Sequence, residues 1–304
     1  MRLHDEKDLP VWRSLLFVPA NIQRFIDKAQ TVAADGIILD LEDSVPSTLK
    51  DSVRQQLPAA VDAVGASGAD VLVRVNQPLE LCVPDFETAI SPKVKALILP
   101  KVESASHVRL LAELADRIEA RHGMKKGHTR FMLLIESPEA LEDIVSIASA
   151  HPRNIAISAG GEDFATATGS LPVGETMIYP RQRSVIAASI AGILPMGLLN
   201  SVAEFNDDAA YRDLVRRSRN FGLRGATCIH PRSVPLLNEG FRPAEHELAA
   251  AQRVVQGFVN ATTAGRASVQ VDGRMVDYPI YDRAIQLLRT AERIKEKESR
   301  QAAV

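Results

Sequence analysis

The sequence has only two cysteines, Cys82 and Cys228, in 304 residues. Two are too few for a disulfide scaffold, and they lack the close spacing of a zinc motif. The histidines form no His-x-x-x-His pair, the spacing with which a helix typically binds zinc. The sequence therefore excludes a disulfide-rich fold and gives no support for a zinc enzyme.

Neither sign of charge is in excess. The 38 acidic and 36 basic residues nearly cancel, which removes the electrostatic argument for binding nucleic acid or a membrane surface. No stretch reaches the roughly 18 consecutive apolar residues of a membrane span. Residues 1–10 are charged and lack the apolar segment of a signal peptide. We therefore expect a cytoplasmic protein whose partners are small molecules.

What the sequence does contain is a series of short apolar runs typical of buried β-strands. The eight runs are 14–19, 36–43, 70–76, 96–103, 130–137, 154–163, 191–199 and 226–231. Helix-period segments lie between most of them, for example 104–121. Parallel strands need such crossovers, so this order predicts an α/β fold, and eight units fit a (β/α)8 TIM barrel better than an open sheet.

The pattern changes after Phe241, although no low-complexity linker divides the chain. The segments that follow predict a long helix, a turn region, a hairpin and an amphipathic helix, over 243–259, 260–267, 268–279 and 280–296. We expect a barrel domain over 1–241 and a C-terminal extension over 242–304 that docks in cis or on a neighbouring subunit.

Two of the apolar runs end at carboxylates, Glu136 and Asp163. Ser137 before Pro138 is a candidate helix N-cap, which places Glu136 at a strand-to-helix junction. The carboxyl ends of parallel strands meet at one rim, where α/β enzymes keep their chemistry. Magnesium usually takes one or two protein carboxylates and leaves its other positions to water and substrate oxygens. We predict that Glu136 and Asp163 bind Mg²⁺, while the alternative for either acid alone is a helix cap or a surface ion pair.

Other polar residues follow the remaining runs and are expected at the same rim: Asp40, Glu42, Asp43, Arg74, Asn76, Lys101, Glu103 and His230. Arg74 is a candidate for binding a substrate carboxylate through two hydrogen bonds. Its alternative role is to be a structural partner for one of the acids. Lys101 is interpreted as an ion-paired lysine, because a metal route needs no imine. His230 is given no catalytic role.

A basic pair, Arg24 and Lys28, lies in the predicted helix after the first run. These side chains are candidates for binding the phosphates of a cofactor. A solvated helix face is the alternative, and the spacing does not decide between the two.

Several motifs together carry a family resemblance. They are Arg13-Ser-Leu-Leu-Phe-Val-Pro19, Asp40-Leu-Glu-Asp-Ser-Val-Pro46 followed by Lys50 and Arg54, Arg74-Val-Asn76, Leu99-Pro-Lys-Val-Glu-Ser104, Ile135-Glu136, Gly160-Gly-Glu-Asp163 and Ile229-His-Pro231. In these residues the chain resembles the HpcH/HpaI aldolase and citrate lyase superfamily, in its citrate lyase beta subunit-like branch with malyl-CoA and citramalyl-CoA lyases. The resemblance runs over nearly the whole chain.

The resemblance implies a (β/α)8 barrel that uses Mg²⁺ to cleave or form carbon–carbon bonds in hydroxy-carboxyacyl-CoA thioesters, commonly as a trimer or hexamer. It implies that Glu136 and Asp163 hold the metal and that Arg74 contacts a 2-oxo acid. Asp40 and Asp43 would shape the substrate site.

The resemblance also points to Asp277. The segment Gly273-Arg-Met-Val-Asp277 is similar to a motif whose acid is delivered from the adjacent subunit for proton transfer. Asp277 is therefore the candidate acid/base, and a surface loop is its alternative. One departure is that 196–206 lacks the acidic stretch expected near the seventh strand end, which bears on acyl-CoA selectivity.

These inferences predict a lyase that converts a 3-hydroxy-carboxyacyl-CoA, such as citramalyl-, malyl- or citryl-CoA, into a 2-oxo acid and an acyl-CoA. One alternative is an aldolase of free 2-oxo acids that does not use CoA. Another is a non-catalytic metabolite-binding subunit of a larger complex.

Overall fold

The computed structural model describes residues 2–200 and 207–303. The chain divides into two compact units, one ending at Phe241 and the other spanning Arg242–Ala303. Part of the 196–206 segment singled out above, residues 201–206, lies outside the described residues, as does Val304 at the end of the predicted extension.

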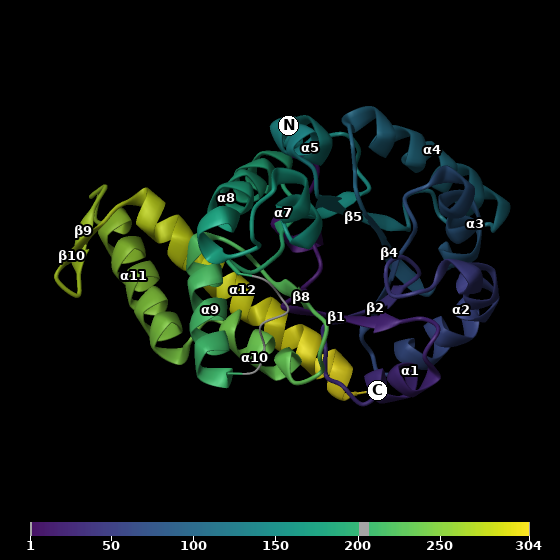
Figure 1. The fold of residues 1–304 in the computed structure, drawn as a ribbon. Coiled ribbons are helices and arrows are strands. Elements are labelled where there is room, and N and C mark those ends of the chain that lie inside the picture. Colours follow the sequence, from purple (N-terminus) through teal and green to yellow (C-terminus); the bar gives the residue numbers. More distant parts are fainter. Residues whose placement is uncertain (1, 201–206, 304) are drawn as a thin grey trace. The chain divides into compact units, whose positions relative to one another are not determined.

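Parallel strands form the centre of the first unit, and helices surround them (Figure 1). The strands are β1 Ser14–Pro19, β2 Gly36–Asp40, β3 Asp70–Arg74, β4 Val94–Leu99, β5 Arg130–Ile135, β6 Asn154–Ala159, β7 Leu194–Pro195 and β8 Ala226–Cys228. Their order in the sheet is β7-β6-β5-β4-β3-β2-β1-β8. Each predicted run contains or overlaps one of these strands, and the predicted (β/α)8 TIM-barrel class is confirmed.

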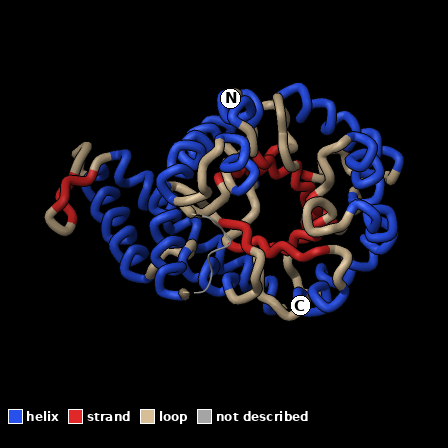
Figure 2. The backbone as a smooth tube through the Cα atoms, viewed as in Figure 1, coloured by secondary structure: helices blue, strands red, loops and turns tan. Residues whose placement is uncertain are grey.

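The sheet curls into a ring (Figure 2), and a short seam joins its two edge strands. Met196, directly after β7, forms a parallel bridge with Gly225, directly before β8. The amide of Gly197 donates to the carbonyl of Gly225 at 2.8 Å, and the amide of Arg224 donates to the carbonyl of Pro195 at 2.9 Å. This seam closes the barrel and abolishes the open sheet edge.

The seam depends on the absence of a side chain at Gly225. A Cβ there would lie 1.7 Å from the backbone oxygen of Trp12, which cannot rotate away. We expect Gly225→Ala to lower the free energy of unfolding by about 2 to 3 kcal/mol, measured by urea unfolding. In the control Gly65→Ala, a Cβ meets only Val71 at 3.4 Å, and the change should stay within about 1 kcal/mol. Equal effects of the two substitutions would contradict this account of closure.

Alternate side chains of each strand pack on opposite faces of the sheet. Leu15, Ile38, Leu72 and Met132 belong to a cluster inside the ring, together with the buried indole of Trp12. Their neighbours along the strands pack in a larger cluster with the surrounding helices. Because both faces are covered, the strands read as continuous apolar runs, as expected for a parallel sheet.

Helices connect the strands of the first unit: α1 Gln23–Ala29, α2 Lys50–Gly65, α3 Leu79–Ala89, α4 Ala105–Arg121, α5 Pro138–Glu142, α6 Ile144–Ala148, α7 Glu162–Thr168, α8 Gly174–Ala191, α9 Asp208–Phe221 and α10 Ser233–Gly240. Ser104 and Ser137 cap α4 and α5 by accepting hydrogen bonds from His107 N and Ala140 N. The predicted helix start after Glu136 is therefore confirmed. Within residues 2–200 and 207–303, none of the helices combines the length and apolarity that crossing a membrane requires.

The second unit contains α11 Glu245–Thr263, the antiparallel pair β9 Val269–Val271 and β10 Arg274–Val276, and α12 Tyr278–Ala302. The two helices pack through an aromatic contact in which Phe258 stacks on Tyr281 with centroids 4.8 Å apart. The hairpin predicted around Asp272 and Gly273 is present, and both residues have positive φ, as its turn requires. The two helices are longer than predicted.

Candidate active site

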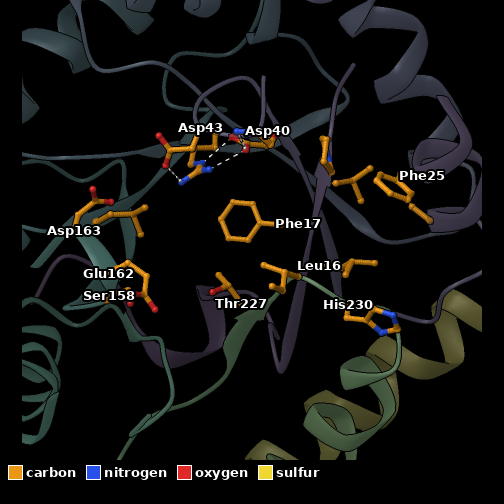
Figure 3. Close-up of a pocket in the computed structure, with 18 of the residues that line it drawn as sticks. Leu16, Phe17, Phe25, Asp40, Asp43, Ser158, Glu162, Asp163, Thr227 and His230 are labelled. Atoms are coloured by element: carbon orange, nitrogen blue, oxygen red, sulfur yellow. Dashed lines mark hydrogen bonds and ion pairs between the residues drawn. The ribbon is translucent and has the colours of Figure 1, made fainter. Parts of the chain in front are cut away.

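A cavity of about 850 Å³ opens at the carboxyl ends of the barrel strands. Residues from the ends of β1, β2, β3, β5, β6 and β8 line it, among them Pro19, Asp40, Arg74, Glu136, Asp163 and His230. Figure 3 shows Asp40, Asp43 and Asp163 around the ring of Phe17. Most of the polar strand ends noted in the sequence therefore meet at one cavity, as the parallel arrangement requires. Among those that do not line it, Asn76 donates to Asp85 and to the carbonyl of Leu41, and Glu103 accepts from Gln77.

Arg74 is the centre of the charged cluster. Its Nε and Nη2 donate to the two carboxylate oxygens of Asp40 at 2.7 and 2.8 Å. Its Nη1 lies 2.9 Å from Glu42 Oε2 and 3.3 Å from Asp43 Oδ2. The guanidinium also lies 4.8 Å from the centre of the Phe17 ring. These contacts match the alternative role stated for Arg74, a partner of the acids, and its contact with a substrate stays a prediction.

Two of the three acids paired with Arg74, Asp40 and Glu42, have pKa values shifted in opposite directions. Burial raises the pKa of Asp40, but the bidentate bonds and charge of Arg74 outweigh burial and hold that pKa below its ordinary value. Burial also raises the pKa of Glu42, and here the attraction of Arg74 and Lys101 does not cancel it. Asp40 is therefore a permanent anion at neutral pH, while Glu42 is the weaker acid.

Lys101 connects the cluster to the end of β5. Its backbone lies in the left-handed region, with φ of 49°, and its amide donates to Glu136 Oε2 at 2.8 Å. Its ammonium donates to Glu42 at 2.8 Å and lies 4.0 Å from Asp163 Oδ1. Burial lowers the pKa of Lys101, but the hydrogen bond to Glu42 and the negative charges of Glu42, Asp43 and Asp163 together outweigh burial and raise it. The interpretation of Lys101 as an ion-paired lysine agrees with these contacts.

Glu136 has the most perturbed carboxyl group of the site. Burial raises its pKa to about 7, and the charges of Asp163 and Glu42 add to this in spite of the hydrogen bond from Lys101. Asp163 stands in the first turn of α7, with a side chain 47% exposed. Five carboxylates at this rim face the cations Arg74 and Lys101. The unbalanced negative charge favours a bound cation.

The raised pKa of Glu136 has a consequence for stability. Between pH 4.5 and about 7 the folded, metal-free protein keeps a proton that the unfolded chain has released, so stability falls as the pH rises through this range. Glutamine imitates the protonated form at every pH. We expect the free energy of unfolding of metal-free Glu136→Gln to be about 1 to 3 kcal/mol higher than that of the parent at pH 8. At pH 5 the two proteins should have equal free energies of unfolding.

Urea unfolding with a chelator at both pH values measures this difference. Glu139→Gln is the matched control, because Glu139 is an exposed acid in the first turn of α5. A mutant no more stable than the parent at pH 8 would contradict the raised pKa.

The remaining predicted residues lie in different places. Lys28 is exposed and lines the cavity, whereas the exposed guanidinium of Arg24 lies over the ring of Phe25, 4.9 Å from its centre. Asp277 is the N-cap of α12 and accepts a hydrogen bond from Ile280 N at 3.4 Å. Asp277 therefore belongs to the second unit, and its part in proton transfer stays a prediction.

Sequence reasoning named Glu42 and Lys101 at the rim but did not include them in the site, and it missed Arg181 altogether. Arg181 comes from the middle of α8, is buried, and lines the cavity. No strand-end pattern can find a residue that reaches the cavity from a surrounding helix. A weak signal existed, because Arg181 and Ser184 are polar residues on the buried side of that helix.

Comparison with known proteins agrees with the motifs. A family model described as HpcH/HpaI aldolase/citrate lyase matches residues 13–231, which include the whole cavity rim. The chain belongs to this family. The resemblance inferred from the sequence motifs is therefore confirmed.

Relatives within the HpcH/HpaI aldolase/citrate lyase family match along nearly their whole length. The citrate lyase subunit beta of Leuconostoc mesenteroides subsp. cremoris is 32% identical, over 92% of this chain and 93% of the relative. The L-malyl-CoA/beta-methylmalyl-CoA lyase of Cereibacter sphaeroides is 30% identical, over 93% of this chain and 95% of the relative. Both names describe carbon–carbon lyases.

Among solved structures of this family, CitE from Mycobacterium tuberculosis superposes with a TM-score of 0.73 at 26% identity. The match covers 94% of this chain and 99% of CitE. That CitE structure contains magnesium, acetoacetate and coenzyme A.

Proposed function

We propose that this protein is a magnesium-dependent carbon–carbon lyase that acts on a CoA thioester. Its substrate is a 3-hydroxy-carboxyacyl-CoA of the citramalyl, malyl or citryl type, and its products are a 2-oxo acid and an acyl-CoA. The observation that carries the proposal is the rim of the cavity, where Glu136 and Asp163 lie close enough for one charge to raise the pKa of the other. The family's named lyases and the magnesium and coenzyme A bound by CitE support it.

The residues at the rim fit a magnesium ion. Glu136 and Asp163 would hold it through carboxylate oxygens, the ligands that Mg²⁺ prefers. The described residues offer no group of three or more histidine, cysteine, aspartate or glutamate side chains gathered as a metal site. A pair of carboxylates suits Mg²⁺, because this ion keeps several positions for water and substrate. When bound, the ion supplies Lewis-acid polarisation of a substrate oxygen.

The chain's own groups account for the rest of the chemistry. In the cleavage direction a base removes the hydroxyl proton, the carbon–carbon bond breaks, and its electron pair passes to the thioester as an enolate. We assign Arg74 to orienting the 2-oxo acid and stabilising this negative charge, with its own position fixed by Asp40 and Asp43. We assign Asp277 as the acid/base, which takes up the hydroxyl proton and delivers a proton to the enolate carbon to give the acyl-CoA.

Binding of the CoA moiety is assigned to the basic residues of α1. Lys28 lines the cavity and can meet a phosphate there. Arg24 does not line the cavity, so it can bind CoA only if the nucleotide of CoA extends beyond the cavity. A homo-oligomer, trimer or hexamer, is part of the proposal, since the family resemblance has Asp277 come from a neighbouring subunit.

Purified protein incubated with Mg²⁺ and malyl-, citramalyl- or citryl-CoA tests the proposal. We expect release of a 2-oxo acid from at least one thioester, with no release in the presence of a chelator. Calorimetry with CoA separates the alternatives: turnover of free hydroxy acids without CoA binding would identify an aldolase of free 2-oxo acids instead. Failure with every substrate, together with metabolite binding, would indicate a non-catalytic subunit.

A further inference from the structure

Arg181 is a buried cation that has no acidic partner within residues 2–200 and 207–303. Its side chain reaches the cavity from α8, and the residue is only 5% exposed. Nη1 donates to Ser158 Oγ at 2.8 Å, and this is the one hydrogen bond of the Arg181 side chain among the described residues. Nε is buried and has no hydrogen-bond partner in the described part of the chain. An uncompensated buried charge is costly, so its presence needs an explanation.

The other buried arginines of the described structure show how this fold normally treats such a charge. Each forms an ion pair with an acid at 2.8 Å or less: Arg13 with Asp35, Arg54 with Asp85, and Arg153 with Glu119. These three support the barrel and its helices and do not line the cavity. Arg181 differs in both respects, because it lines the cavity and lacks the acid.

Gly197, two residues after the end of β7, leaves the space beside Arg181 free of a side chain. The backbone there has φ of +136°, and a Cβ would lie 2.7 Å from Arg181 Nη1. The guanidinium therefore packs against bare backbone on this side. Burial lowers the pKa of Arg181 to about 10, so the group is still a cation at neutral pH.

The position of Ser158 gives the depth of Arg181 in the barrel. Ser158 on β6 pairs with Leu134 on β5, and both line the cavity. Glu136 and Gly160 follow two residues later, directly after the ends of these strands and about 7 Å nearer the mouth. A ligand whose outer oxygens lie at Glu136 therefore reaches Arg181 with its inner end.

We propose that Arg181 and Ser158 form a carboxylate-binding subsite below the acidic cluster, filled by a second carboxylate of the substrate. The inference rests on the proposed function and narrows it to a dicarboxylic 2-oxo acid as the product released within the barrel. The substrate's carboxylate supplies the countercharge that the protein omits. A planar guanidinium with free donors is suited to this group.

The test compares oxaloacetate, which has a second carboxylate, with pyruvate, which does not. We expect wild-type protein with Mg²⁺ to bind oxaloacetate ten- to a hundredfold more tightly than pyruvate, measured by calorimetry. Arg181→Met should abolish this preference and leave the affinity for pyruvate unchanged. Arg183→Met is the matched control, because Arg183 lies two residues later on α8 outside the cavity lining, and it should keep the preference.

A second variant remains informative where Arg181→Met does not fold. Ser158→Asp places a carboxylate beside the guanidinium that Ser158 Oγ already contacts. We expect this variant to melt a few degrees above wild type, because the buried charge gains a partner, and to lose the preference for oxaloacetate. A structural role for Arg181 alone predicts the higher melting temperature without the loss of preference.

Four results would overturn the inference, and they differ in what else they refute. Equal binding of oxaloacetate and pyruvate by wild type, or a preference that survives Arg181→Met, removes the subsite and leaves the lyase proposal standing. An Arg181-dependent preference for malonyl-CoA over acetyl-CoA, without one between the oxo acids, places the second carboxylate on the acyl thioester instead. Binding of neither oxo acid refutes the proposed function, and the subsite with it.

Discussion

Replacing either Glu136 or Asp163 by alanine is expected to reduce Mg²⁺-dependent turnover at least about 10³-fold. The physical reason is that each substitution removes one of only two protein ligands proposed for the ion, and the Lewis acid supplies several kcal/mol of stabilisation to the reaction. The measurement is the steady-state rate as a function of Mg²⁺ concentration, combined with calorimetric titration of Mg²⁺ alone. We expect both the rate and the heat of Mg²⁺ binding to disappear.

Glu139→Ala is the control for these variants, because it removes an exposed acid three residues from Glu136. It should bind Mg²⁺ and turn over as wild type does. Folding of the alanine variants is checked by their unfolding transitions, and Glu136→Ala should be no less stable than the parent without metal, since burial already raises the pKa of Glu136. Normal activity in both alanine variants would contradict the assignment of Mg²⁺ to Glu136 and Asp163.

Arg74→Met is expected to give the largest loss of stability, about 3 to 5 kcal/mol at pH 7. Asp40 and Glu42 have side chains only 3% and 9% exposed, and both lose their guanidinium partner in this variant. Asp40 is then a buried carboxylate without its ion-pair partner, and Glu42 keeps only Lys101, which accounts for the loss. Urea unfolding at pH 7 measures it.

The pH dependence identifies the cause. Asp40 has a lowered pKa in the folded protein, so the stability from its pairing with Arg74 is present above the ordinary pKa and fades as the pH falls through the folded value. The difference between Arg74→Met and wild type should therefore shrink in acid. Arg121→Met is the control, because its ion pair with Glu87 is exposed and worth less than about 1 kcal/mol. A loss in Arg74→Met no larger than in this control contradicts the account.

The fold could be predicted because its strands are covered on both faces. Runs such as 131–135 are apolar at every position, and Ser137 before a proline reports where the next helix begins. The seam that closes the barrel was harder to predict from the sequence, because β7 has only two residues and β8 only three. Closure there depends on backbone contacts at Gly225 rather than on a side-chain pattern.

The candidate site was predictable to the extent that its residues follow strands. Asp40, Arg74 and Glu136 meet at one rim because parallel strands end together, but the sequence could not show that Arg74 is engaged by three acids. Those contacts depend on the course of the loop after β2. Arg181 lies on a helix, so only the packing of that helix brings it to the cavity.

Residue 197 is subject to two independent requirements at once. Its amide donates to the carbonyl of Gly225 across the seam between β7 and β8. The space that a side chain would occupy is already filled by the guanidinium of Arg181. A substitution at residue 197 would therefore disturb both the closure of the barrel and the packing around Arg181. Because φ of +136° and the adjacent guanidinium both disfavour a side chain here, a library that varies this position should return glycine.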